Sequence, residues 1–439
     1  MTAPRIDRIL AEAAPGEIRA VAFAGDAAWD IAFERPGGDA GEGDIYWARA
    51  GAPGPGGGRF FDLGGGRVGF ARRPRRQWSD GAYGLVQIAR ASAGDKGARV
   101  TDRVELAEGS VAAWLHASGP VADRLEIARG VPKAAREALR AAVGAKLPAD
   151  VGARILLGEP DRVVATLLDL LARLRAMEAG SGPPKRAFVA GGEVTRSIRR
   201  WPEAIWAPAD PATAAWLVAA GLPPALLSAP DDGVCREIDS EIAAARLSAV
   251  DLPGGARLWI EPTRALVAID VDSGASAAAA PAINAAAGRE IARQFRLRRL
   301  GGLIAIDFLK EGMAEGHAAL RSFAADDPWP WTPPASADPS GLTALQRARL
   351  GPSLLNMTEG DVAAGLAALR LAIRVSRRGR APAQLEARAG VIGQLRGQLR
   401  EAHRAAVARL GAPLDLTIVE GLRFARILGQ HGEILEEAT

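Results

Sequence analysis

Three aspartates at the ends of two apolar runs are the residues of this 439-residue chain that are best suited to chemistry. The run ALVAID ends at Asp270, Asp272 follows two residues later, and the run GLIAID ends at Asp307. A carboxylate in such a position is costly to bury unless it is paired, hydrogen-bonded or bound to a metal. Three carboxylates in one small volume suit a hard divalent cation, Mg²⁺ or Mn²⁺.

Residues 257–309 must position these aspartates, and their pattern predicts strand, turn, strand, loop, helix and strand. Apolar runs of this length, rich in β-branched residues and bounded by Gly and Pro, are typical of buried strands. The predicted helix would form a crossover connection between the two strands. We therefore expect Asp270 and Asp307 at one edge of a shared sheet. Because side chains two apart on a strand share a face, Asp270 and Asp272 should point the same way.

Length and composition indicate a globular protein of two to four domains, of mixed α/β class. The chain is 48% hydrophobic and 24% charged, with a formal net charge of only +4. One cysteine, Cys235, and four scattered histidines argue against a disulfide framework and against a zinc site. The start lacks a signal-peptide pattern, and no apolar run approaches the roughly 20 residues of a membrane span. We therefore expect a soluble, cytoplasmic protein.

Arginine dominates the basic residues: only 5 of the 55 are lysines. Arginine favours bidentate contacts with phosphate, which would suit a nucleic-acid partner. A GC-rich genome also enriches Arg, Ala and Gly throughout a protein. Both explanations stay open.

Residues 43–102 are rich in short predicted strands with Gly-rich turns, which suggests a small barrel of the OB type. Such barrels bind single strands by stacking bases on exposed aromatic side chains beside a basic track. Phe60, Phe70 and Lys96 are the candidates for binding RNA in this way. The alternative is that the phenylalanines belong to the core and that the nearby basic run is a solvated face; this run contains Arg72, Arg73, Arg75 and Arg76.

The remaining pattern alternates helices and strands. Residues 1–40 give two strands, too few for a domain, so we expect them to pair with a later segment. Thr358 has capping-box spacing to Asp361, with Asp in place of Glu or Gln, and should open a helix. The last 60 residues predict a strand, one long helix over 391–411, and two further strands.

The central segment resembles the ribonuclease E/G family of bacterial endoribonucleases, with similar element order over nearly the whole chain. The motifs that carry the resemblance are LPGG (252–255), ALVAIDVDSG (265–274), EIARQFRLRRLGGLIAIDF (290–308) and RLGPSL (349–354), together with GDIYWA, FFDLGGGRVGF and GDKGA in the predicted barrel.

The resemblance implies a specific α/β multidomain architecture. An RNase H-like subdomain would be split between residues 1–42 and 181–248. The OB-type barrel (43–102) and a 5′-sensor segment (103–180) would be inserted within it. A DNase I-like catalytic domain (249–357) and a small C-terminal α/β domain (358–439) would follow.

The resemblance also implies an activity, the cleavage of single-stranded RNA with Mg²⁺ held by Asp270 and Asp307. Attack by water rather than by the ribose 2′-OH leaves a 5′-phosphate and a 3′-OH. RNA processing or decay, rRNA maturation included, would be its setting. Helical spacing places Arg289, Arg293 and Arg296 on one face of the predicted helix, where they would hold the RNA backbone. A solvated helix face is the equal alternative.

This chain departs from the family pattern near the expected sites. Asp272 stands where the family usually has Asn, and it could add a metal ligand or repel phosphate. Lys310 stands where the family has a second acidic residue. These changes keep open an alternative function, that of an RNA-binding protein of the same fold that has lost turnover.

Two further departures bear on substrate and assembly. The Arg-Thr pair of the family's 5′-monophosphate pocket is replaced by Ile155 and Leu156, with Arg154 one residue early, so we expect 5′-end sensing to be lost or weak. The paired-cysteine zinc link of larger members is missing. Any oligomer should therefore not be linked through zinc.

Overall fold

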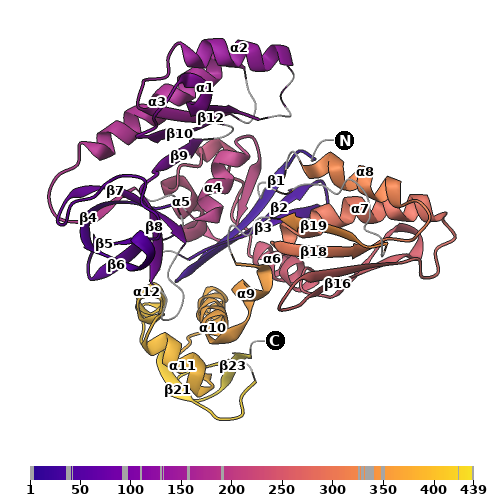
Figure 1. Ribbon diagram of the computed structural model, residues 1–439. Helices are drawn as coiled ribbons and strands as arrows, with labels where there is room; N and C mark the ends of the chain where they lie inside the picture. Colours follow the sequence, from indigo (N-terminus) through magenta and orange to yellow (C-terminus); the bar gives the residue numbers. More distant parts are fainter. Residues whose placement is uncertain are drawn as a thin grey trace. The chain divides into compact units, whose positions relative to one another are not determined.

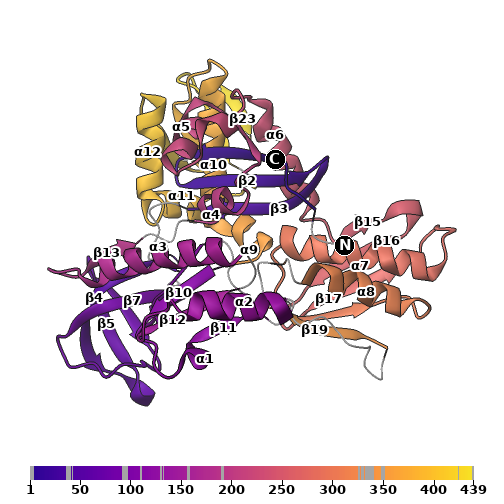
Figure 2. The same cartoon turned by 90° about the horizontal axis from the view of Figure 1, so that it is seen from above.

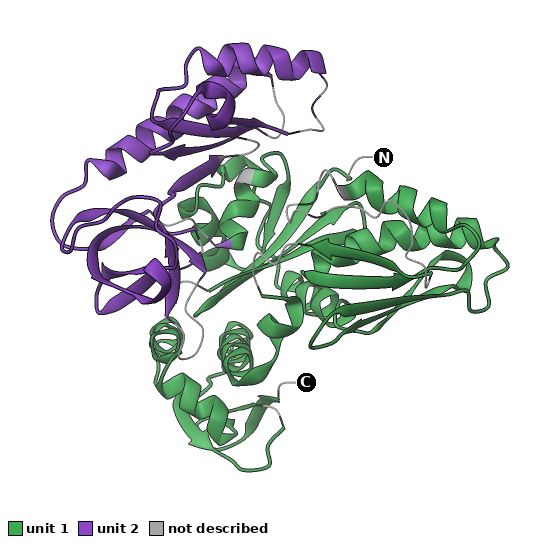
Figure 3. Ribbon diagram, in the orientation of Figure 1, with its two compact units in different colours: residues 1–37, 193–439 green, residues 38–192 purple. Residues whose placement is uncertain are grey.

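The computed structural model describes residues 4–35, 41, 43–90, 97–108, 111–128, 131, 133–155, 159–188, 192–324, 327, 331, 341–347, 352–423 and 425–437. The chain divides into two compact units, residues 1–37 with 193–439, and residues 38–192 (Figure 3). Both units combine sheets with helices (Figure 1). The predicted α/β class is therefore confirmed.

The unit formed by residues 38–192 begins with a five-stranded closed barrel. Its strands follow the order β4-β5-β6-β8-β7, and β4 also pairs with β7, which closes the ring. Tyr46, Phe61 and Val86 fill the interior and are almost fully buried. This closed barrel fits the predicted OB type. Its strands are β4 (Ile45–Pro53), β5 (Arg59–Gly64), β6 (Arg67–Ala71), β7 (Tyr83–Arg90) and β8 (Ala98–Thr101), and β13 (Lys185–Phe188) pairs outside with β4.

The same unit contains a second sheet, ordered β11-β12-β10-β9, with helices packed against it. Leu139, Leu167 and Leu174 from two of these helices are fully buried in the core beneath the sheet. The predicted helix–strand–helix pattern is confirmed here. The elements are β9 (Glu105–Glu108), β10 (Val111–Leu115), α1 (Val121–Arg124), β11 (Leu125–Ile127), α2 (Lys133–Gly144), β12 (Val151–Ile155) and α3 (Pro160–Glu178).

The other unit starts with a four-stranded sheet, ordered β14-β1-β2-β3. Strand β1 lies parallel to β14, which comes after the whole of residues 38–192, so the N-terminal strands do pair with a later segment. The sequence predicts β2 and β3 but not β1, whose RILAEAA is rich in alanine. The strands are β1 (Arg8–Ala14), β2 (Glu17–Ala24), β3 (Ala27–Glu34) and β14 (Ile205–Pro208), and the helices are α4 (Glu193–Arg200), α5 (Pro211–Ala219) and α6 (Gly233–Ala244).

A five-stranded central sheet follows, ordered β15-β16-β17-β18-β19. Figures 1 and 2 show α7 and α8 side by side over one face of it. Gly288 of α7 permits this approach, since a Cβ there would lie 2.5 Å from the Gly316 carbonyl oxygen of α8. The elements are β15 (Ala249–Asp251), β16 (Arg257–Pro262), β17 (Val267–Asp272), α7 (Ala280–Leu297), β18 (Gly302–Asp307), α8 (Met313–Ala324) and β19 (Thr343–Arg347).

The C-terminal part differs from the sequence prediction at two helix boundaries. The capping box belongs to Ser353 and Asn356 at the short helix α9, whereas Thr358 is the last residue of that helix. The predicted long helix is broken at residues 397–399, where Gly397 departs from helical geometry. The elements are α9 (Leu354–Thr358), α10 (Gly360–Arg377), β20 (Gln384–Ala387), α11 (Ala389–Arg396), α12 (Arg400–Leu410), β21 (Asp415–Ile418), β22 (Arg426–Leu428) and β23 (Ile434–Glu437).

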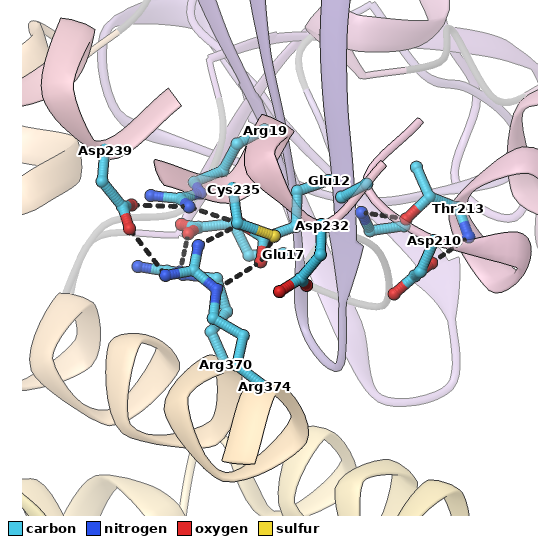
Figure 4. A network of polar contacts seen from close by, with 12 residues as sticks. Glu12, Glu17, Arg19, Asp210, Thr213, Asp232, Cys235, Asp239, Arg370 and Arg374 are labelled. Carbon is cyan, nitrogen blue, oxygen red and sulfur yellow. Dashed lines mark hydrogen bonds and ion pairs between the residues drawn. The ribbon is translucent and has the colours of Figure 1, made fainter. Parts of the chain in front are cut away.

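A buried ionic network joins α10 to the N-terminal sheet (Figure 4). Arg374 donates two 2.8 Å hydrogen bonds to the Glu12 carboxylate, which also pairs with Arg19, and it bonds Asp239 at 2.6 Å. Burial would raise the pKa of Glu12, but Arg19 and Arg374 hold it well below its ordinary value. The small C-terminal part is thus tied to strands β1 and β2 by charge as well as by packing.

The single thiol lies at the edge of this network. Cys235 is buried beside Glu12, and burial together with the Glu12 charge raises its pKa to about 12. A thiol in this state stays protonated and is a poor metal ligand. Among the helices that the structure describes, none is long and apolar enough to cross a membrane.

Candidate active site

Asp270 and Asp307 lie directly opposite each other on adjacent strands of the central sheet. Strands β17 and β18 are parallel, and Asp270 is the register partner of Asp307 at their carboxyl ends. The residues beside them in the strands, Ile269 and Ile306, are buried under α7 and α8. Because side chains alternate along a strand, both aspartates point from the opposite, open face of the sheet. The expected meeting at one edge is therefore what the structure shows.

Negative charge accumulates at this point of the sheet. Burial raises the pKa of Asp270, and the neighbouring charges of Asp307 and Asp272 raise it further. In the described part of the chain, no arginine or lysine forms an ion pair with any of these three aspartates; the nearby Arg257 pairs with Asp251 instead. A divalent cation would relieve this repulsion.

Asp272 has a local structural partner. It lies at the end of β17 and is exposed, and its Oδ1 accepts a 2.9 Å hydrogen bond from the Gly274 N–H. Gly274 has a φ of +51°, and a Cβ there would lie 2.6 Å from the Gly255 carbonyl oxygen. Asp272 thus caps a tight turn that only glycine completes easily. An asparagine oxygen would accept the same hydrogen bond.

Asn284 is a residue of this site that the sequence interpretation missed. It is fully buried on α7, and its side chain bonds both the N–H and the carbonyl of Leu309, as well as the Glu311 carbonyl. The loop that it holds follows Asp307 directly. A polar residue among the apolar positions of the NAAAGREIARQF helix is the signal that could have revealed it.

The oxygen-rich pair fits a magnesium-type ion, although the described residues contain no cluster of three His, Cys, Asp or Glu side chains placed to hold a metal. Mg²⁺ is commonly bound by one or two carboxylates, with water and substrate phosphate completing its shell. Asp270 and Asp307 supply two carboxylates and an excess of negative charge. Asp272, turned to Gly274, adds charge nearby.

Comparison with known proteins finds a family likeness over the segment that carries this geometry. Residues 234–323, which contain both aspartates and Asn284, match the model of the ribonuclease E/G family. This segment is therefore similar to the ribonuclease E/G family. The match takes in α6, the central strands up to β18, and both covering helices.

Individual relatives are similar to this chain over segments of comparable length. Ribonuclease E of Nostoc sp. is 45% identical over 78 residues, 16% of this chain and 11% of the relative. Ribonuclease E of Escherichia coli is 46% identical over 79 residues (17% and 7%), and a chloroplastic ribonuclease E/G-like protein of Arabidopsis thaliana is 42% identical over 81 (17% and 8%). The matched segment thus spans about a tenth of these relatives' length.

Two of the three arginines on α7 already have partners in the fold. Arg293 pairs with Glu290 and donates to the Ala28 carbonyl of β3, and Arg296 pairs with Asp30 of β3 at 3.1 Å. Arg289 is exposed. Of the three arginines predicted to hold the RNA backbone, Arg289 is therefore the one with an exposed side chain.

The barrel places its two candidate phenylalanines together. Phe60 of β5 and Phe70 of β6 are register partners, with ring centroids 4.9 Å apart, and Phe60 is 40% exposed. Both rings lie against Gly54, so they pack under the Gly-rich 54–58 loop rather than in the barrel interior. Lys96 lies outside the described residues. Of the basic run, Arg72, Arg73 and Arg75 are exposed, and Arg76 stacks on Trp78.

The predicted 5′-sensor positions have structural partners. Ile155 is fully buried in the core at the end of β12. Arg154 forms an ion pair with Glu105 of β9 through one guanidinium nitrogen. Leu156 lies outside the described residues. Of the two described positions, one is apolar and the other is engaged in an ion pair.

Proposed function

We propose that this chain is a Mg²⁺-dependent endoribonuclease that cleaves single-stranded RNA. The main support for this proposal is the in-register pair Asp270 and Asp307, which lies within the segment matched to the ribonuclease E/G family. Mn²⁺ would serve as a substitute ion. The named subdomains, RNase H-like (1–42 and 181–248), sensor-like (103–180), DNase I-like (249–357) and small C-terminal (358–439), belong to the same proposal.

Each part of the site has a role in this proposal. Asp270 and Asp307 would hold the ion, which when bound supplies an acidified water molecule and charge neutralisation at the scissile phosphate. Asn284 fixes the loop after Asp307. Arg289 and the exposed Lys310 offer positive charge to the RNA backbone. The paired rings of Phe60 and Phe70 offer a stacking surface for bases.

The 5′ end of the RNA would not be sensed in this proposal. The supporting observations are the burial of Ile155 and the ion pair between Arg154 and Glu105. Substrate choice would then depend on the barrel and the central sheet. Zinc-linked dimers are not part of the proposal because Cys235, the only cysteine, is buried and protonated.

A second candidate is an RNA-binding protein that has lost turnover. Lys310 favours it, because an exposed ammonium three residues after Asp307 stands where the family has an acid. Such a charge would retain affinity for phosphate while it weakens the hold on a cation. Both candidates bind single-stranded RNA, so cleavage is the property that separates them.

The test is a cleavage assay on single-stranded RNA with Mg²⁺, run beside Asp270→Asn and Asp307→Asn. Each substitution should reduce the cleavage rate at least 100-fold, because one carboxylate alone is a poor magnesium site. Glu315→Gln is the matched control, since Glu315 is an exposed carboxylate on α8, over the opposite face of the sheet. If cleavage persists in both aspartate variants, Asp270 and Asp307 do not form the active site. RNA binding without cleavage in Mg²⁺ or Mn²⁺ would establish the second candidate.

A further inference from the structure

Trp259 is an exposed indole on the open face of the central sheet. It lies on β16 between Leu258 and Ile260, which are both buried under the covering helices. Its side chain therefore points to the other face, where it remains 37% exposed. Its register partners on the two neighbouring strands are Ala249 and Asp270, so the indole has little apolar cover from them.

The register places this indole in one row with the aspartate pair. Trp259 is the partner of Asp270 across β16 and β17, and Asp270 is the partner of Asp307 across β17 and β18. Two strand spacings of roughly 4.8 Å each separate Trp259 from Asp307. A nucleotide whose phosphate is held at the aspartates would have its own base, or the base of its neighbour, beside the indole.

The surroundings of Trp259 select the kind of occupant. The Arg257 guanidinium lies over the indole, 5.8 Å from the ring centroid, and pairs with Asp251. Asp270, Asp272, Asp307 and the exposed Glu261 add negative charge to this face. A second copy of the chain docked here would have to bury these charges, at a cost of several kcal/mol per ion. A flat base covers the indole alone and leaves the carboxylates to water and metal.

We infer that Trp259 forms a nucleobase-stacking site beside the aspartate pair, which takes an unpaired base of single-stranded RNA next to the cleaved bond. This inference rests on the proposed function for its substrate. It adds a positioning residue on the central sheet itself, separate from the aromatic pair of the barrel. An indole stacks on any base, so the site favours unpaired RNA rather than one sequence.

The experiment measures binding and cleavage separately, using a 12-nucleotide single-stranded RNA and the full chain. Binding is followed by fluorescence anisotropy with Ca²⁺ in place of Mg²⁺, and cleavage with Mg²⁺. The variants are Trp259→Ala and Trp259→Phe, with Leu303→Ala as the matched control. Leu303 is 44% exposed on the same face, but it lies four residues before Asp307 on β18. A second set of RNAs carries one abasic nucleotide at each position in turn.

We expect Trp259→Ala to weaken binding about tenfold, within the range measured for single stacking aromatics. Trp259→Phe should retain most of the affinity, and Leu303→Ala should match the wild type. One abasic position next to the cleaved bond should cost the wild type a similar factor and cost Trp259→Ala nothing further. The abasic series on the wild-type chain keeps the inference testable if Trp259→Ala fails to fold.

Specific results would overturn the inference. Wild-type affinity in Trp259→Ala, or equal abasic losses in both proteins at every position, would exclude stacking even if cleavage depends on Asp270 and Asp307. A change of oligomeric state in Trp259→Ala, without a change in affinity, would assign the indole to a contact between copies. Conversely, an abasic effect that depends on Trp259, without cleavage in any metal, would support stacking while the nuclease proposal fails.

Discussion

Asn284 and Leu309 are joined by two hydrogen bonds, one from the amide Nδ2 to the Leu309 carbonyl at 2.8 Å and one from the Leu309 N–H to Oδ1 at 3.1 Å. The side chain of helix α7 thus pairs with the backbone after Asp307 as a neighbouring strand would. The position of this aspartate depends on the helix as well as on the sheet. The crossover helix α7 and the end of strand β18 therefore form one structural unit.

Asn284→Ala should therefore impair both stability and cleavage. Loss of the amide leaves backbone groups of the loop without partners, at a cost of about 1–3 kcal/mol. The cleavage rate should fall while RNA affinity with Ca²⁺ stays near the wild-type value, because Asn284 does not reach the surface. Thermal unfolding and single-turnover cleavage measure the two effects. An unchanged rate in the folded variant would show that the loop does not govern the site.

Asp272→Asn should move the pH dependence of cleavage without affecting the fold. Asp272 is one of the charges that raise the pKa of Asp270, so its removal lowers that pKa. Asp270 must be ionised to hold a cation, and the acid limb of the pH–rate profile should therefore shift to lower pH. The melting temperature should hold, since an amide oxygen can accept from Gly274. A shift toward higher pH would contradict this electrostatic account.

Arg374→Ala should destabilise the contact between α10 and the N-terminal sheet. It leaves the buried Glu12 with the Arg19 ion pair and the hydrogen bond from Cys235, and the cost should be about 3 kcal/mol at neutral pH. Because the pKa of Glu12 is lowered in the fold, this stabilisation is present above the unfolded pKa of about 4.3 and fades as the pH falls below it. Urea denaturation at pH 7 and pH 3.5 should show the larger difference at pH 7.

Arg378→Ala is the control for that experiment. Arg378 follows α10 directly, but its ion pair with Glu436 is exposed and should contribute less than about 1 kcal/mol. Equal destabilisation by both changes would mean that packing of the arginine stems, rather than the buried charge, holds α10 in place.

The 5′ end of the substrate should have little influence on cleavage. Ile155 is buried and apolar, and the Arg154 guanidinium is paired with Glu105, which weakens any attraction for a terminal phosphate. One RNA prepared with a 5′-monophosphate and with a 5′-hydroxyl should be cleaved at rates within about threefold, less than the tenfold that 1.4 kcal/mol of binding would give. A preference of tenfold or more for the monophosphate would refute the loss of sensing.

Phe60→Ala should weaken RNA binding by the barrel. Its ring is exposed and supported by Phe70, and the loss of one stacking aromatic costs about 1–3 kcal/mol. Val68→Ala is the matched control, because Val68 is a 54% exposed apolar residue on the neighbouring strand β6. Similar losses in both variants would indicate general apolar contact instead of stacking.

The central sheet was predictable because local pattern and tertiary environment agree there. Strands β17 and β18 are apolar runs rich in Ile and Val, and a parallel pair joined by a helix needs no further information to align its ends. Asp270 and Asp307 follow from that pattern. Asn284 did not, because its partners are backbone groups of a loop that no sequence period describes.

Other parts were decided by contacts distant in sequence. Arg293 and Arg296 have the spacing of a free basic face, but strand β3 provides Ala28 and Asp30 as their partners. Strand β1 escaped prediction because its conformation depends on pairing with β2 and β14 rather than on the propensity of RILAEAA. The break before α12 occurs at Gly397 in a segment whose composition otherwise favours one continuous helix.

The parallel pairing of β1 with β14 has a consequence for biosynthesis. Strand β1 ends at Ala14, whereas its neighbour begins at Ile205, after the complete 38–192 unit has been made. At about 5–20 residues per second, translation leaves that edge of the N-terminal hairpins without its partner for roughly ten seconds or more. The inserted unit can fold on the ribosome first, and chaperone protection would matter most for the nascent β1 edge, which is where an aggregating intermediate would begin.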